Sequence, residues 1–422
     1  MRTPARRICL ITSGHIFSTP RLVKEAEALA EEGHEVSLVA GSFFAPGEPL
    51  DLAILERTGW PATLVRADHG PQMWLNRLRQ HWLRRYRPST RKLSLMRALR
   101  LNNPELPRLV DAAIATGADF FHGHCLGGLA AAAQAAARRG VPYGFDAEDF
   151  HAGETEVVEQ DAFERAIVER ITGAYLQGAA LRTAASPLIA EEYRKTLGVP
   201  MEVVLNVFPR RHAPAQLSPA RRITRATPAR CYWFSQTVGP GRGLEQMFEV
   251  LARMQTPTEL QLRGFVSSAH AARLNELANR AGMTRPLVFL PPASPEEMVR
   301  LAADAELGLS LEECRPRNRD LCLTNKIFVY LLAGLPQLLS RTTAQAALAP
   351  ELGAAALLGD LTQPAETARQ LDTFFSDPQR MESARHCAWE LARKRFCWDV
   401  EKENLLRTLR TVLSGTAYHH SL

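Results

Sequence analysis

The 422-residue chain lacks a long hydrophobic run. Its most apolar stretch, residues 327–339, is interrupted by Gly334 and Pro336, and it is shorter than the roughly 20 residues that a membrane-spanning helix needs. We therefore expect no membrane-spanning segment. The composition, with 46% hydrophobic and 23% charged residues, excludes a disordered or fibrous chain and is ordinary for a globular protein.

A disulfide pattern is also missing. The seven cysteines show no Cys-x-x-Cys spacing, and their odd number leaves no complete set of pairs. This favours a reducing compartment, so we expect a cytoplasmic protein. The net charge of +6 favours anionic partners, but it does not distinguish nucleotide diphosphates, lipid headgroups and nucleic acids.

Acidic residues are absent from residues 72–100, which carry nine lysines and arginines. In a helix, one face of this segment would hold Trp74, Leu78, Trp82 and Tyr86. Such a basic amphipathic helix is typical of contact with an anionic membrane surface, which suggests a protein that is peripheral on the inner face of the cell membrane. The alternative is a solvated basic helix that buries its aromatic side chains in its own domain. No nucleic-acid recognition module accompanies the segment, so we expect no nucleic-acid partner.

Residues 208–230 lack acids as well, and their prolines and arginines predict a linker between two domains. Two domains are also what the chain length predicts. We expect a first domain at residues 1–207, the linker at 208–230, a second domain at 231–396, and a terminal helix at 397–422 that packs back towards the first domain.

Strand-length apolar runs alternate with helical patterns in both halves. Residues 7–13 predict a strand, Thr19 and Pro20 suit the start of a helix, and residues 36–40 predict the next strand. The second half repeats the pattern, and Ser294 with Glu297 predicts a capping box before another helix. The fold class is therefore α/β, with two Rossmann-like domains built on parallel sheets.

In such domains, ligands bind at the loops that follow the carboxyl ends of the strands. The first domain offers Ser13, Gly14 and His15 at this position. The second domain offers a glycine-rich turn, in which the backbone N–H groups and an arginine suit a diphosphate; its residues are Gly239, Gly241, Arg242 and Gly243. The alternative is a tight strand-to-helix turn with a solvated arginine.

A second phosphate-binding candidate is the start of the helix after residue 323. Thr324, Asn325 and Lys326 place the positive end of a helix dipole beside an ammonium group. The alternative is an ordinary helix cap with a surface lysine.

Histidines and acids cluster around two further strand ends. His122 and His124 would share one face of a strand, but no third ligand with suitable spacing follows, so we predict no metal site. After the next strand come Asp146, Glu148 and Asp149. These acids either cap a helix, or they raise one another's pKa and orient an acceptor hydroxyl.

The order of these motifs along the chain resembles that of group 1 glycosyltransferases, family four, which have the GT-B fold of two Rossmann-like domains facing a cleft. The resemblance lies in residues 11–15, 20–26, 145–149, 204–207, 242–245 and 325–336. It implies transfer of a sugar, with retention of configuration, from a nucleotide-diphosphate donor in the second domain to a glycan or lipid-linked acceptor in the first. Polysaccharide or glycoconjugate biosynthesis is the implied process, with no metal and no other cofactor. Ser13, Gly14 and His15 would then form an acceptor-side loop.

The chain departs from this family at three positions. Two glutamates that hold the donor in the family are replaced by Leu321 and Val329, for which Glu312 or Glu313 is a candidate substitute. Glu148 stands where many relatives have a histidine, so we expect Glu148 and His124 to be the catalytic residues. The alternatives are a nucleotide-sugar epimerase of the same fold and a degenerate, non-catalytic binding protein, which the lost glutamates favour.

Overall fold

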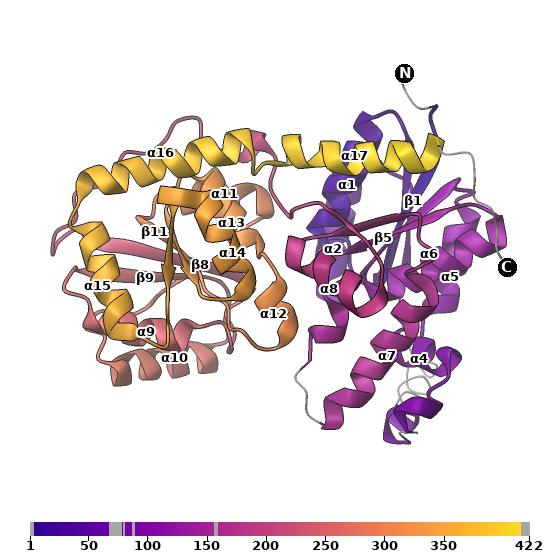
Figure 1. Cartoon of the computed structure of the whole chain (residues 1–422), viewed down its shortest axis with the longest axis horizontal. Helices are drawn as coiled ribbons and strands as arrows, with labels where there is room; N and C mark the ends of the chain where they lie inside the picture. Colours follow the sequence, from indigo (N-terminus) through magenta and orange to yellow (C-terminus); the bar gives the residue numbers. More distant parts are fainter. Residues whose placement is uncertain (1–3, 67–77, 79–80, 87–88, 156–158, 415–422) are drawn as a thin grey trace. The chain divides into compact units, whose positions relative to one another are not determined.

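The computed structural model describes residues 4–66, 78, 81–86, 89–155 and 159–414. The chain divides into a first unit of residues 1–204 with 402–422 and a second unit of residues 205–401. By this division the segment predicted as a linker lies in the second unit. Each unit is built on its own parallel sheet, which confirms the predicted α/β class with two Rossmann-like domains (Figure 1).

The first unit holds a seven-stranded sheet in the order β3-β2-β1-β4-β5-β6-β7. Its strands are β1 (Arg7–Thr12), β2 (Glu35–Ser42), β3 (Ala62–Arg66), β4 (Phe120–His124), β5 (Tyr143–Ala147), β6 (Leu181–Ala184) and β7 (Glu202–Val203). Its described helices are α1 (Pro20–Glu31), α2 (Glu48–Thr58), α4 (Leu95–Asn102), α5 (Leu106–Ala115), α6 (Cys125–Arg139), α7 (Glu159–Tyr175) and α8 (Pro187–Leu197). Because β1 pairs with both β2 and β4, the loops after β1 and β4 meet at the carboxyl edge of the sheet.

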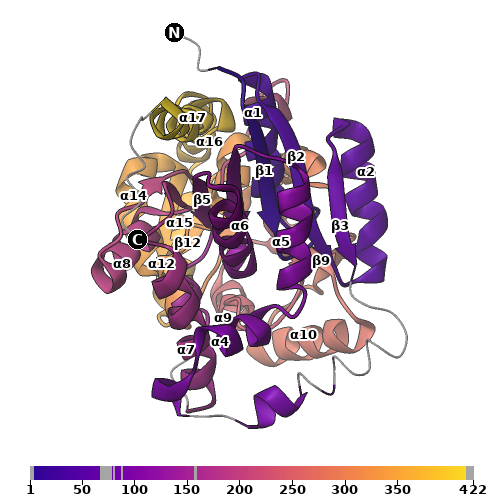
Figure 2. The same cartoon turned by 90° about the vertical axis from the view of Figure 1, so that its right-hand side faces the viewer.

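Helices cover both faces of this sheet, so its central strands are buried along nearly their whole length. Figure 2 shows α5 and α6 over one face. Helix α6 packs very close to β4, since a Cβ atom on Gly123 would lie 2.3 Å from the carbonyl oxygen of Gly128. Glycine at residue 123 is therefore required for α6 to begin directly after β4.

The second unit holds a six-stranded sheet in the order β10-β9-β8-β11-β12-β13. Its strands are β8 (Ala229–Thr237), β9 (Thr258–Phe265), β10 (Val288–Leu290), β11 (Leu307–Ser310), β12 (Gln337–Ser340) and β13 (Ala356–Gly359). Its helices are α9 (Leu244–Arg253), α10 (Ser268–Ala281), α11 (Pro295–Ala302), α12 (Arg317–Leu321), α13 (Asn325–Leu332), α14 (Thr343–Leu352), α15 (Pro364–Phe375) and α16 (Pro378–Lys394). The order places β8 beside β11, so the loops after these strands meet at the carboxyl edge.

A last helix, α17 (Trp398–Ser414), runs across the division between the units. Its later part contacts other residues of the first unit, where Lys402 lies 2.7 Å from Glu31 and Arg410 lies 2.7 Å from Glu32. The first unit is therefore built from two separate segments of the chain.

Several predicted elements are confirmed. The strand expected at residues 7–13 is β1, α1 begins at Pro20, and the capping box of Ser294 and Glu297 makes both of its hydrogen bonds. Thr19 is the N-cap of α1, but its hydroxyl donates to the carbonyl oxygen of His15 at 3.2 Å and does not cap the helix. Across the described residues, no helix combines the length and the apolar character needed to cross a membrane.

Candidate active site

The loop after β1 is held by a buried histidine. His15 lies 2.6 Å, through Nδ1, from a carboxylate oxygen of Asp51 on α2, and its Nε2 accepts hydrogen bonds from the backbone N–H groups of Phe43 and Phe44. Since Nε2 accepts, the proton belongs on Nδ1, which donates to Asp51. Both ring nitrogens of His15 are thus used to join the loop after β1 to helix α2 and to the segment that follows β2. Ser13 is partly exposed at the same edge of the sheet.

Next to this loop, Arg21 on α1 is completely buried. Its guanidinium donates two hydrogen bonds to Asp146 at the end of β5, at 2.6 and 2.7 Å, and a third to the carbonyl oxygen of Val204 at 2.6 Å. Burial acts to lower the pKa of Arg21, but the carboxylates of Asp146 and Glu25 raise it above its usual value. This bidentate pair ties α1 to the carboxyl end of β5.

One turn further along α1, the Glu25 carboxylate faces the two histidines of β4. It lies 3.2 Å from Nε2 of His122 and 3.3 Å from Nε2 of His124, and one ligand atom from each of the three residues falls within 4.8 Å of the others. A third ligand for the histidine pair was not predictable from the spacing, because Glu25 comes from α1, far from β4 in the chain. The other nitrogen of His124 lies 3.6 Å from Asp146, so both of its ring nitrogens face buried carboxylates.

In this network of Glu25, His122, His124 and Asp146, neighbouring charges shift the pKa values of Glu25 and His124 in the direction opposite to burial. Burial would raise the pKa of Glu25, yet His124 and His122 hold it well below its usual range. Burial would lower the pKa of His124, yet Glu25 raises it. Both shifts favour an ionised Glu25 beside a protonated His124.

Glu148, one residue past β5, is half-buried and lies at the edge of this network. Burial, followed by repulsion from Asp149, raises its pKa to about 7. Lys24 on α1 is buried, and burial together with the charge of Arg21 lowers its pKa to about 7. Glu148 and Lys24 act on each other electrostatically, so the first unit holds an acid and a base that both titrate near neutral pH.

In the second unit, the glycine-rich turn connects β8 to α9. Gly241 and Gly243 have φ angles of 67° and 72°, in the left-handed region that favours glycine. Gly243 is the N-cap of α9. The turn thus brings Arg242 to the carboxyl edge of the second sheet.

Three basic side chains surround one carboxylate at this edge. Glu312, which follows β11, lies 3.0 Å from Nζ of Lys326, 3.4 Å from Nη1 of Arg242 and 3.6 Å from Nη1 of Arg319. Arg319 also donates a hydrogen bond to the carbonyl oxygen of Gly241. The structure thus brings together Arg242 and Lys326, which the sequence analysis named separately, and adds Arg319. We call Arg242, Arg319 and Lys326 the basic cradle.

The first turn of α13 borders the basic cradle. Thr324 is its N-cap, but the side chain makes no capping hydrogen bond, and the buried hydroxyl has no hydrogen-bond partner among the described residues. The start of α13 therefore keeps N–H groups and a hydroxyl for an anion. Leu321 and Val329 are buried and apolar, and Glu312, a candidate substitute for the missing glutamates, is engaged by the cradle.

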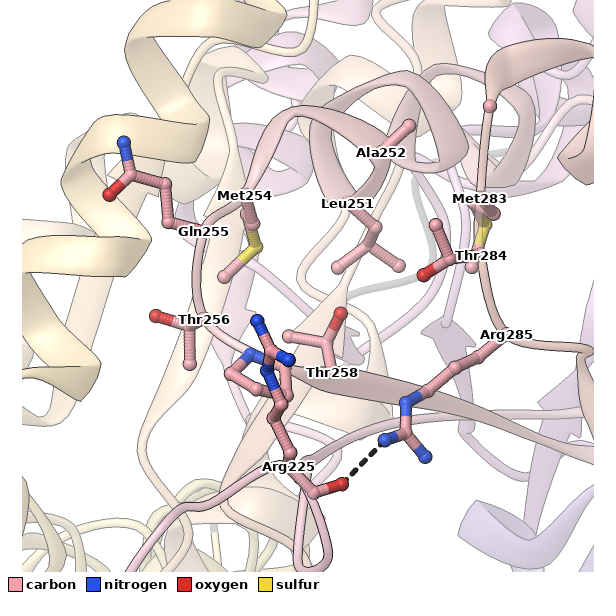
Figure 3. Close-up of a pocket in the computed structure, with 12 residues that line it drawn as sticks. Arg225, Leu251, Ala252, Met254, Gln255, Thr256, Thr258, Met283, Thr284 and Arg285 are labelled. Carbon is pink, nitrogen blue, oxygen red and sulfur yellow. Dashed lines mark hydrogen bonds between the residues drawn. The ribbon is translucent and has the colours of Figure 1, made fainter.

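A separate cavity of about 300 Å³ lies at the opposite edge of the second sheet. It borders Thr258 at the start of β9 and the residues after α10, and Arg285 donates to the carbonyl oxygen of Arg225 across it at 2.6 Å (Figure 3). Ligands of doubly wound sheets bind at the carboxyl ends of the strands, so this cavity is distinct from the basic cradle.

The basic segment of residues 72–100 is described in part. Trp82 and Tyr86 are exposed by 67% and 73%, which contradicts the alternative that they are buried in their own domain. Arg97 lies over the ring of Tyr86 at 5.4 Å. Trp74 lies outside the described residues.

Three residues that organise the two sites had no predicted role: Arg21, Glu25 and Arg319. A signal for the first two was present, because they are charged residues, four positions apart, among the apolar positions of α1. Arg319 had no such signal, since its contacts with Gly241 and Glu312 depend on the path of the loop.

Comparison with known proteins supports a sugar-transferring enzyme. Residues 19–207 match the model of the glycosyl transferase 4-like domain. No curated protein sequence matches the chain. HepE from Anabaena, solved with UDP and glucose, superposes with a TM-score of 0.72 at 15% identity over 96% of this chain and 100% of that chain.

Two further solved structures have the same fold. Sucrose-phosphate synthase from Thermosynechococcus elongatus has a TM-score of 0.69 at 15% identity, over 97% of this chain and 100% of that chain. A Listeria monocytogenes protein assigned as a UDP-N-acetylglucosamine 2-epimerase has a lower TM-score of 0.56 at 13% identity, over 98% of each chain. At these identities the likeness shows the fold alone, and the matched family domain adds the activity. The chain is therefore a glycosyltransferase of GT-B fold, in which residues 19–207 carry a glycosyl transferase 4-like domain.

Proposed function

We propose that this glycosyltransferase moves a sugar, with retention of configuration, from a nucleotide-diphosphate donor to a glycan or lipid-linked acceptor in polysaccharide or glycoconjugate biosynthesis. The observation that carries the proposal is the basic cradle beside the uncapped start of α13, at the carboxyl edge of the second sheet. Guanidinium groups and helix N-termini are the groups that bind diphosphates best.

In this proposal the cradle acts on the leaving group. As the bond between sugar and diphosphate breaks, negative charge grows on the diphosphate. Arg242, Lys326 and the N–H groups of α13 stabilise that charge because they are already oriented when the reaction begins. Arg319 anchors the turn that carries Arg242.

The first unit supplies the acceptor side. Glu148 is half-buried near the end of β5, and as a carboxylate it accepts a hydrogen bond from an acceptor or sugar hydroxyl. His124 has both nitrogens turned towards Glu25 and Asp146, so its role is to position the network that supports β5. Ser13 and Gly14 border the same edge on the neighbouring strand β1.

No metal ion or other cofactor takes part in the proposed reaction. Glu25, His122 and His124 have the spacing of metal ligands, but Arg21 lies 3.4 Å from the same Glu25 carboxylate. One arginine and one proton on His124 balance the two buried carboxylates, Glu25 and Asp146, whereas a divalent cation would leave excess positive charge in a buried site.

UDP-glucose is the first donor to test, because HepE, a structural relative, was solved with UDP-glucose. Purified protein is incubated with UDP-glucose and other nucleotide sugars, and binding and UDP release are followed with and without oligosaccharide or polyprenyl-phosphate acceptors, in the presence of a chelator. We expect release that depends on acceptor and survives chelation. Conversion of the nucleotide sugar into its epimer without acceptor and without UDP release would favour an epimerase, and binding of no nucleotide sugar would overturn the proposal.

Arg242→Gln tests the cradle directly. Loss of a charged hydrogen-bond donor is expected to weaken UDP binding by about tenfold to a hundredfold. The matched control is Arg253→Gln at the far end of α9, where the arginine contacts Glu249 only within its own helix. Isothermal titration calorimetry with UDP gives the comparison, and equal affinity for the wild type and Arg242→Gln would refute the role of Arg242.

A further inference from the structure

A buried carboxylate at an anion-binding edge requires an explanation. The Glu312 side chain is 1% exposed, and its backbone N–H donates to the hydroxyl of Ser340 at the end of β12, at 2.9 Å. Burial of a carboxylate costs free energy unless it is paired. The three cradle cations supply the pairing, so the position of Glu312 is fixed by both backbone and side chain.

The two arginines of the cradle are more accessible to solvent than Glu312. Arg242 is 35% and Arg319 is 25% exposed, whereas Lys326 is 5% exposed and is buried like Glu312. Glu312 therefore lies behind the arginines, where it affects a bound anion through its charge without touching it.

The charges of the cluster leave a surplus of two. Arg242, Arg319 and Lys326 carry three positive charges, and Glu312 carries one negative charge. An intact nucleotide-diphosphate sugar carries one negative charge on each of its two phosphates. After the sugar has left, the terminal phosphate becomes a monoester-like group that gains further negative charge near neutral pH.

We propose that Glu312 is a positioning residue that sets the charge of the basic cradle to match the intact donor, and that it thereby weakens the binding of the more highly charged nucleoside diphosphate product. This inference rests on the proposed function, because it assigns a charge selectivity to the same donor site. A carboxylate behind the cradle repels the product more than the donor, which favours product release after each transfer.

Glu312→Gln removes the charge and keeps the shape of the side chain. UDP and inorganic pyrophosphate are expected to bind about tenfold more tightly, because a like charge several ångströms away in a partly buried site is lost. UDP-glucose gains less, so the ratio of UDP to UDP-glucose affinity rises. In steady state we expect a lower kcat, a lower KM for donor and stronger inhibition by UDP.

Two variants act as controls. Glu306→Gln removes another buried carboxylate of the second unit. The Glu306 side chain is 2% exposed and is paired with Arg221 at 2.6 Å, not with the cradle. This variant is expected to leave the affinities for UDP, pyrophosphate and UDP-glucose unchanged. Glu312→Asp keeps the negative charge and is expected to retain the selectivity of the wild type.

The outcomes separate this inference from the proposed function. If Glu312→Gln weakens all three ligands or leaves their ratio unchanged, Glu312 only holds the cradle together and the charge-setting role is overturned. If the wild type binds pyrophosphate but no nucleotide, a nucleotide-diphosphate sugar is not the donor. The pyrophosphate affinities of the wild type and Glu312→Gln then still test the role of Glu312. If the wild type binds neither, both proposals are overturned.

Discussion

Glu148 is the residue in the first unit whose protonation is most open to experiment. The groups that act on it are Asp149 and Asp146, which raise its pKa, and Arg21 and Lys24, which lower it, while burial is the largest influence. The result is a pKa of about 7, so the side chain is neutral in mild acid and ionised in mild base.

This gives a prediction for activity against pH. Only the ionised form accepts a charge-assisted hydrogen bond from a hydroxyl, so kcat/KM is expected to rise as the pH is increased from about 6 to about 8. Glu148→Gln should lower kcat/KM by about tenfold or more and remove this rise. The control is Glu191→Gln, a half-buried carboxylate on α8 that is paired with Arg194. If kcat/KM of the Glu148→Gln enzyme still rises with pH in the same way, the rise is not caused by ionisation of Glu148.

At the scale of elements, α1 is joined to the first sheet by buried charges in addition to apolar packing. Arg21 and Glu25 reach β5 and β4 respectively, and neither is exposed. Buried pairs of this kind are costly to break one partner at a time, because the remaining charges are left without compensation. The position of α1 relative to β4 and β5 therefore depends on these buried ion pairs.

Glu25→Gln is expected to destabilise the protein by about 3 kcal/mol. Glu27→Gln, on the same helix but paired with an exposed Arg57, should cost less than about 1 kcal/mol. Differential scanning calorimetry of the three proteins makes the comparison. Similar transitions for Glu25→Gln and Glu27→Gln would show that the network does not hold α1.

The same variant changes the titration of His124. Its pKa lies above its ordinary value of 6.5, so the protonated ring stabilises the fold fully below that value, and the contribution is lost as the pH rises through the higher folded-state pKa. Without Glu25 the effect of burial dominates, and the pKa of His124 should fall. Histidine ring resonances measured by NMR at different pH values report this shift.

Prediction from sequence succeeded where a pattern is local. The alternation of apolar residues gave β1 and α1, and Ser294 with Glu297 gave the capping box. The meeting of Glu25 with His122 was not predictable in this way, because it depends on β4 pairing beside β1 although two strands intervene in the chain. Helix α2 was missed because it exposes Leu50 and Leu52 and so shows no amphipathic pattern.

For the molecule as a whole, we propose attachment to an anionic membrane surface through the segment of residues 72–100. In sedimentation with vesicles that contain phosphatidylglycerol, the protein is expected to pellet at low salt and to be released at high salt, because screening weakens electrostatic attraction. Trp82→Ser with Tyr86→Ser should reduce pelleting. Phe265→Ser, which removes an aromatic side chain of similar exposure in the second unit, should not. No pelleting of the wild type at low salt would overturn the proposal.

The assignment of residues 402–422 to the first unit has a consequence for biosynthesis. A ribosome makes residues 1–204 before the second unit, but it makes Lys402 and Arg410, the partners of Glu31 and Glu32, only after the second unit. The second unit is a continuous segment and can fold while the chain is still being made. The first unit begins earlier and is completed later, so a nascent chain that ends at residue 401 carries all residues of the second unit but lacks residues 402–422 of the first.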